Sequence, residues 1–287
     1  MRVGFYCPLI GVEFLKSLRV SPVDLRTIMY EKVDCDLSPF ESNRCCLIRA
    51  ISSIASDSQF VDGIILTNCC HEQEQLAGIL AKTNVKVYTI NIPRNFNDDS
   101  IRYLLEQIEY LRRKIGCGFS KVLDVSEYIG GLVEERISFE PHLNRLPVYV
   151  SGISIPPWFA TLLDANRLVA IARRKCSHVS PINIDLLNGN LDFDKIAGCF
   201  SCMRDMSSAE EMMSLKNDIS KYSPVAAVFV SMKSCTASSY YFVKFKEQFQ
   251  TENIPVFKIG VTDWNTPSMS VVTQIETIAQ MCWGNDS

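Results

Sequence analysis

The chain has 287 residues, of which 47% are hydrophobic and 21% are charged, and its formal net charge is −3. This composition is typical of globular proteins, and the length corresponds to roughly two domains of about 150 residues each. Acidic and basic residues are interleaved, which argues against a patch that binds nucleic acid or a membrane surface. The apolar stretch of residues 1–18 is interrupted by Pro8 and Glu13, and no run approaches the ~20 apolar residues of a membrane span. We therefore expect a cytoplasmic protein without a signal peptide.

The first part of the chain is expected to alternate strands with helices. Short apolar runs predict strands at 3–7, 20–25, 61–66 and 85–90. Helical spacing of apolar residues, or a composition typical of helices, predicts helices at 10–18, 47–56 and 71–82, and a further helix with Asp98, Asp99 and Ser100 as candidate caps and Gly116 as its stop. In the last of these, Ile101, Leu104, Leu105, Ile108 and Leu111 repeat at helical spacing. Alternation of this kind is typical of a parallel sheet.

The second part repeats the plan after a predicted helical linker. Strands are predicted at 148–150, 168–172, 225–230 and 256–259, with Ser151 and Gly152 forming a turn after the first of them. Helices are predicted at 156–166, 207–219, 237–250 and 273–281. The expected fold class is α/β, with two doubly wound parallel-sheet domains facing each other across a cleft. The predicted boundaries are 1–119 for the first domain, 120–145 for the linker and 146–287 for the second domain.

The chain holds twelve cysteines, and structural disulfides are not expected in a cytosolic protein. Cys70 and Cys235 each follow a predicted buried strand and precede a predicted helix. That edge of an open α/β sheet is where ligands bind, and a helix N-terminus favours the thiolate form. Cys46 begins the preceding helix and could reach the same point. Three converging thiolates suit an iron–sulfur or zinc centre, whereas the alternative is that these residues are small buried hydrophobes.

Two further groups of residues are candidates for chemistry. Cys199 and Cys202 form a C-x-x-C, which indicates a redox pair or half of a zinc site, or else a loop with incidental thiols. His71 follows Cys70 directly and is a candidate acid or hydrogen-bond donor to a metal ligand, the alternative being an exposed histidine at a helix start. The sequence contains no P-loop, no G-x-G-x-x-G and no G-x-S-x-G, so nucleotide binding is unsupported.

Six stretches, taken in order, resemble the 2-hydroxyacyl-CoA dehydratase/benzoyl-CoA reductase family, in particular its D-component type of subunit. They are GFYCPLIGVEFLKSL, SNRCCLIRAISSI, VDGIILTNCCHEQEQLAGIL, YTINIPRNFNDDSIRYLLEQIEYLRRKIG, GCFSCMRDMSSAEEMMSL and PVAAVFVSMKSCTASSYYFVKFKEQFQTENIPVFKIG. Together they cover most of the chain. The specificity of the resemblance comes from the ordered set, because no single motif is decisive.

The resemblance implies a [4Fe–4S] cluster held by three cysteines, with one iron open to substrate or water. Matched residue by residue, the ligands are Cys46, Cys70 and Cys235, with Cys45 and Cys69 as adjacent rivals. A role for Cys202 as a further metal ligand stays open. Family members act as lyases or reductases. They receive one low-potential electron from a separate ATP-hydrolysing activator protein and pass it to an acyl-CoA thioester, forming a ketyl radical. A homologous partner subunit, in a homo- or heterodimer, is also implied.

The chain departs from the family pattern in three ways. It is shorter than typical members, since residues 118–146 stand in place of a longer helical insertion that helps to shape the acyl-CoA site. His71 stands where Asp is usual, and Gln274 where a basic residue is expected. Two alternatives therefore remain beside the enzyme. One is a non-catalytic electron-transfer or scaffold relative that keeps the cluster, and the other is a zinc or thiol-redox protein.

Overall fold

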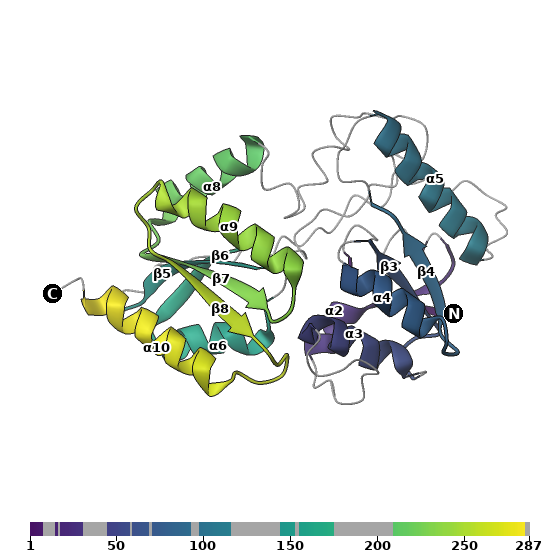
Figure 1. Cartoon of the computed structure of the whole chain (residues 1–287), viewed down its shortest axis with the longest axis horizontal. Coiled ribbons are helices and arrows are strands. Elements are labelled where there is room, and N and C mark those ends of the chain that lie inside the picture. Colours follow the sequence, from purple (N-terminus) through teal and green to yellow (C-terminus); the bar gives the residue numbers. More distant parts are fainter. Residues whose placement is uncertain are drawn as a thin grey trace. The chain divides into compact units, whose positions relative to one another are not determined.

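The computed structural model describes residues 1–7, 15, 16, 18–30, 45–57, 59–68, 71–92, 98–115, 144–152, 155–174 and 209–284. The chain divides into two compact units (Figure 1). The first unit comprises Met1–Glu41, Ile48–Val133 and Val179–Ser201, and the second comprises Ser42–Leu47, Glu134–His178 and Cys202–Ser287. Among the described residues, no helix has both the length and the apolar character needed to cross a membrane.

The first unit contains a four-stranded parallel sheet. Its strands are β1 (Arg2–Phe5), β2 (Ser21–Asp24), β3 (Gly63–Thr67) and β4 (Lys86–Ile90), in the order β2-β1-β3-β4. Every residue of β3 is buried, as expected for a central parallel strand that is covered on both faces. The order reverses between β1 and β3, and at such a switch point an open α/β sheet binds ligands beyond the carboxyl ends of its strands.

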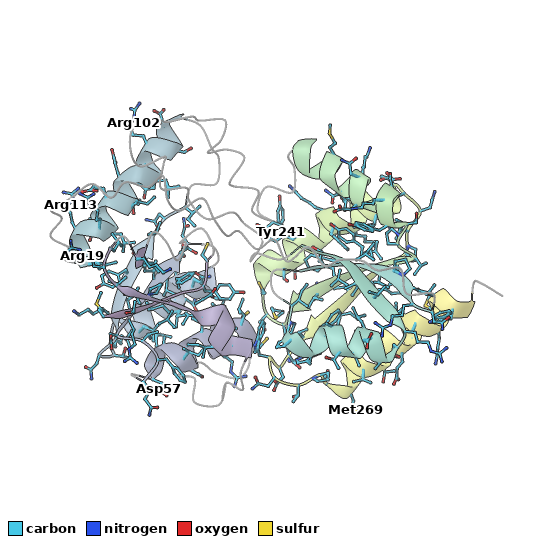
Figure 2. The ribbon with its side chains drawn as sticks, turned by 180° about the vertical axis from the view of Figure 1, so that it is seen from behind. Arg19, Asp57, Arg102, Arg113, Tyr241 and Met269 are labelled. Carbon is cyan, nitrogen blue, oxygen red and sulfur yellow. The ribbon has the colours of Figure 1, made fainter. Side chains whose placement is uncertain are left out.

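The helices of the first unit are α2 (Leu25–Tyr30), α3 (Cys46–Ser56), α4 (His71–Leu80) and α5 (Asp98–Ile115), although the first two residues of α3, Cys46 and Leu47, are assigned to the second unit. Leu104, Ile108 and Leu111 of α5 are buried, so the predicted apolar spacing is confirmed at these three positions. On the opposite side of α5, Arg102 and Arg113 project into solvent (Figure 2). α5 packs on β4, while α4 packs on both β3 and β4.

The second unit repeats the strand order of the first. Its strands are β5 (Leu146–Gly152), β6 (Leu168–Arg174), β7 (Ala226–Met232) and β8 (Val256–Val261), all parallel and in the order β6-β5-β7-β8. Its helices are α6 (Pro157–Ala165), α8 (Ala209–Tyr222), α9 (Thr236–Gln250) and α10 (Met269–Gly284). α8 and α9 cover one face of this sheet, and α6 and α10 cover the other (Figure 1). This arrangement is doubly wound.

An aromatic cluster fills the space between α9 and the second sheet. Tyr149 of β5 and Phe229 of β7 are fully buried there against Phe245 and Phe249 of α9. The ring centroids of Phe245 and Phe249 lie 4.7 Å apart, and those of Tyr149 and Phe249 lie 4.9 Å apart. Contacts of this kind add to the free energy of apolar burial, so the cluster anchors α9 on the sheet.

The predicted α/β architecture with two parallel sheets is confirmed, while the cleft between two facing domains stays a prediction. The turn predicted at Ser151 and Gly152 is wrong, because both residues belong to β5 and Gly152 pairs with Val230. A Cβ atom on Gly152 would lie 2.5 Å from the Val230 carbonyl oxygen, so this glycine allows a close approach of two strands. The closing helix was expected at 273–281 but spans Met269–Gly284. Nearly all of the predicted linker 120–145 lies outside the described residues.

Candidate thiol site

The turn that joins β7 to α9 holds one of the predicted cysteine ligands. Met232 ends β7, and the backbone N–H of Cys235 donates to the Met232 carbonyl oxygen at 3.1 Å. Ser234 closes the turn with a left-handed φ of 62°. The Lys233 N–H donates to the carbonyl oxygen of Val261, the last residue of β8, at 2.8 Å. These bonds fix Cys235 at the carboxyl edge of the second sheet.

Cys235 is the N-cap residue of α9. Its side chain is buried, and its sulfur accepts a hydrogen bond from the backbone N–H of Ser238 at 3.5 Å. Oxygen-bearing side chains usually take this position, where they satisfy one of the free N–H groups of the first helical turn. The partial positive charge of a helix N-terminus favours thiolate over thiol. The local structure therefore favours a sulfur that can act as a metal ligand.

Cys46 lies against the same turn. It is the first residue of α3 and belongs to the segment Ser42–Leu47, which is part of the second unit. Its thiol donates to the Met232 sulfur at 3.4 Å, and both side chains are 1% exposed. Met232 therefore contacts Cys46 through its thioether and Cys235 through its carbonyl group. Cys45, the alternative ligand next to Cys46, is also buried.

Cys69 and Cys70 lie outside the described residues, but both flanks of this segment are described. The buried Gln73 side chain of α4 reaches back to the end of β3. Its Oε1 atom accepts from the Thr67 N–H at 3.1 Å and from the Thr67 hydroxyl at 3.2 Å. The bonds tie the last residue of β3 to the first turn of α4, so the strand end and the helix start that flank Cys70 are held together.

The flanks of Cys70 repeat a hydrogen bond found beside Cys235. The Asn68 N–H donates to the carbonyl oxygen of Ile90, the last residue of β4, at 3.3 Å. This bond corresponds to the one that Lys233 makes with the last residue of β8. Asn68 also accepts, through its side-chain oxygen, from the Ile92 N–H at 2.8 Å. Each cysteine follows the end of its strand by three residues, so the sequence positions of the two thiols are equivalent.

The structure leaves the remaining predicted site residues untested. His71 is the first residue of α4, but its side chain is not described, and Cys199 and Cys202 lie outside the described residues. In the part of the chain that is described, no three His, Cys, Asp or Glu side chains form a group that could hold a metal ion. Cys70 lies outside that part of the chain.

Three residues of these turns were missed by the sequence analysis: Met232, Gln73 and Ser238. The position three residues after a cap is a recognisable signal, and it would have indicated both Gln73 and Ser238. No local signal indicates Met232, because its contact with Cys46 joins residues that are 186 positions apart.

The fold and the thiols together define an α/β protein of two parallel sheets, with buried cysteines at helix starts. The family model of the 2-hydroxyglutaryl-CoA dehydratase D-component (HGD-D) matches residues 124–282, more than half of the chain. The chain therefore belongs to this family. The matched part contains the second sheet and Cys235, while Cys46 and Cys70 precede it.

No curated protein matches the chain. Solved structures that it is similar to include the SBP FpvC of Pseudomonas aeruginosa in three forms. The complex with Mn²⁺ is 11% identical, with 99% of each chain covered and a TM-score of 0.30. The complex with a Ni²⁺ ion is 10% identical, with 100% of this chain and 98% of that chain covered and a TM-score of 0.30. An FpvC mutant is 9% identical, with 99% of this chain and 100% of that chain covered and a TM-score of 0.25. Similarity at this level supports no argument about function.

Proposed function

We propose that this chain is the iron–sulfur subunit of a system of the 2-hydroxyacyl-CoA dehydratase/benzoyl-CoA reductase type, which passes a low-potential electron to a thioester substrate. Membership of the D-component family supports a dehydratase-type enzyme and implies a partner subunit. The observation that carries the proposal is the position of the Cys46 thiol, 3.4 Å from the sulfur of Met232, whose carbonyl group binds the Cys235 backbone. Two thiols that are distant in sequence thus adjoin one residue.

The described thiols have the donor chemistry that an iron–sulfur cluster requires. Cys46 and Cys235 are soft donors, both are buried, and both stand at the start of a helix, where negative charge is stabilised. With Cys70 they would hold a [4Fe–4S] cluster, and Cys45, Cys69 and Cys202 are the alternative ligands. When bound, such a cluster supplies one-electron transfer and an open iron site for a carbonyl oxygen.

The protein's own residues would exclude water from the site and would supply a proton to the substrate. Cys46, Met232 and Cys235 leave little surface to solvent, and a site with little water strengthens electrostatic interactions. His71, next to Cys70, is proposed as the acid that protonates the leaving hydroxyl oxygen of a 2-hydroxyacyl group. A separate ATP-hydrolysing activator would deliver the electron, and the acyl-CoA thioester would receive it.

Anaerobic purification followed by metal analysis tests the proposal. The wild-type protein is expected to be brown and to contain about four iron and four sulfide ions per chain. Cys46→Ser, Cys70→Ser and Cys235→Ser should each lower the iron content. Cys282→Ser is the matched control, because Cys282 is also buried but lies near the end of α10. A colourless wild-type protein without iron would reject the proposal, and zinc in its place would favour the zinc alternative.

EPR spectroscopy separates the enzyme from a non-catalytic relative. If the chain carries the substrate site, addition of an acyl-CoA should perturb the EPR spectrum of the reduced cluster, because substrate would bind beside the open iron. An unchanged spectrum, with the iron content intact, would instead support an electron-transfer or scaffold subunit. The short segment at 118–146 makes this measurement informative, since the family uses a longer insertion there to shape the acyl-CoA site.

A further inference from the structure

Ser238 stands out among the buried polar residues of the second unit. It is 0% exposed, and its hydroxyl group has no hydrogen-bond partner among the residues that the structure describes. Its backbone N–H donates to the Cys235 sulfur at 3.5 Å. A buried hydroxyl without a partner costs free energy, and alanine is the better residue for a helix. The residues that the structure describes therefore supply no internal reason for a serine here.

The geometry of α9 directs the Ser238 side chain toward the cysteine. In an α-helix the Cα–Cβ bonds tilt toward the N-terminus, and residues three apart share one face. Ser238 is the third residue of α9, and Cys235 is its N-cap. The Cα–Cβ bond of Ser238 therefore tilts toward the end of the helix where the sulfur lies. A ligand bound to that sulfur would come within reach of this hydroxyl group.

An unpartnered buried hydroxyl group is not unusual by itself in this protein. Ser52 and Ser53 of α3 also have buried hydroxyl groups without a partner among the described residues. They lie six and seven residues after Cys46, about 9–10 Å along the helix axis. Among the hydrogen bonds described for these three serines, only that of the Ser238 backbone N–H reaches a predicted metal ligand, the Cys235 sulfur. This contrast provides a matched control.

We propose that the Ser238 hydroxyl group donates a hydrogen bond to a sulfur of the iron–sulfur cluster held by Cys235, and thereby raises the reduction potential of that cluster. The inference rests on the proposed function. Hydrogen bonds to cluster sulfurs stabilise the reduced state, which is the more negative one, and so raise the potential. Ser238 thus sets the reduction potential of the cluster, whereas the binding of iron depends on the cysteines.

The experiment compares Ser238→Ala with Ser52→Ala in the full chain, purified without air. The measurements are the iron content, a redox titration followed by EPR, and electron–nuclear double resonance in H₂O and D₂O. Ser238→Ala should keep the wild-type iron content, have a midpoint potential shifted to more negative values and lose one exchangeable-proton coupling. Ser52→Ala should match the wild type in all three measurements. Ser238→Thr, which keeps a hydroxyl group, should return the potential toward the wild-type value.

An unchanged midpoint potential in a cluster-bearing Ser238→Ala protein would overturn the inference while leaving the proposed function intact. The same holds for a folded Ser238→Ala protein that binds no iron, because loss of a donor should alter the potential and not the loading. If Ser238→Ala does not fold, the wild-type spectrum decides, since the absence of any exchangeable-proton coupling contradicts the proposed bond. A wild-type protein without iron defeats the proposed function itself, and this inference with it.

Discussion

Replacement of Gly152 by alanine should destabilise the second unit. Gly152 ends β5 and pairs with Val230 in the centre of the sheet. The added Cβ atom would lie 2.5 Å from the Val230 carbonyl oxygen and 3.0 Å from the Val230 Cβ atom. Real Cβ atoms essentially never approach another atom more closely than 3.0 Å, and the oxygen belongs to the backbone of a fully buried residue. The two strands must therefore separate.

The expected cost is about 1–3 kcal/mol, the range for overpacking a well-packed interior. Gly260→Ala is the matched control, because Gly260 lies in β8 of the same sheet and its Cβ atom would meet nothing within 4 Å. That substitution should stabilise the protein by about 0.4–1 kcal/mol, since alanine has less freedom in the unfolded chain. The two variants should then differ by about 1.5–4 kcal/mol in the free energy of unfolding.

Urea denaturation followed by tryptophan fluorescence suits this comparison. Trp158, Trp264 and Trp283 are the three tryptophans of the chain, and all belong to the second unit, so the signal reports that unit. A Gly152→Ala protein with the wild-type midpoint would refute the steric argument. An equal loss of stability in Gly260→Ala would also refute the argument. The loss would then come from replacing any glycine in a strand, and not from the close approach of β5 and β7.

Three further predictions concern other contacts. Gln73→Ala should lower the free energy of unfolding by about 1–3 kcal/mol, because two buried Thr67 donors lose an acceptor. Gln73→Glu, which keeps an acceptor oxygen, should retain most of that stability. Circular dichroism during urea unfolding measures both variants. Phe245→Ala should cost about 3–5 kcal/mol in the same titration followed by tryptophan fluorescence. The Arg2 side chain hydrogen-bonds to Asp62 and holds the pKa of that carboxyl below its ordinary value. The ionised Asp62 carboxylate therefore adds stability above the unfolded-state pKa, and this contribution is lost as pH falls through the lowered folded-state pKa. The stability difference between the wild type and Asp62→Asn should therefore shrink as unfolding is measured below about pH 4.

Much of the fold follows from local pattern. The apolar run at 225–230 and the apolar helical spacing that includes Leu104, Ile108 and Leu111 predicted β7 and α5, because a buried strand and an amphipathic helix have distinct periods. Gly152 shows where local pattern is insufficient. Its role depends on a strand more than seventy residues later in the chain, and a glycine at a predicted strand end is equally consistent with a turn.

The candidate site was predictable to a similar extent. Cys235 was placed at a strand-to-helix junction because the residues on either side of it predict those two elements, and the structure places it there as a helix cap. The contact of Met232 was not predictable, because it joins residues 186 positions apart, and the capping position that indicates Ser238 does not indicate that its hydroxyl group is buried without a described partner. Neither property can be inferred from the neighbouring residues in the sequence.

The hydrogen bonds that Asn68 and Lys233 make to the ends of β4 and β8 have a consequence for variation. Each bond is donated by a backbone amide to a backbone carbonyl, so it does not depend on which side chain occupies the position. A substitution at Lys233 can therefore change the charge beside Cys235 while β7 and β8 stay in register. At Asn68 the backbone bond would persist, but the side-chain bond to the Ile92 N–H would be lost. The end of β7 is thus freer to vary in charge than the end of β3.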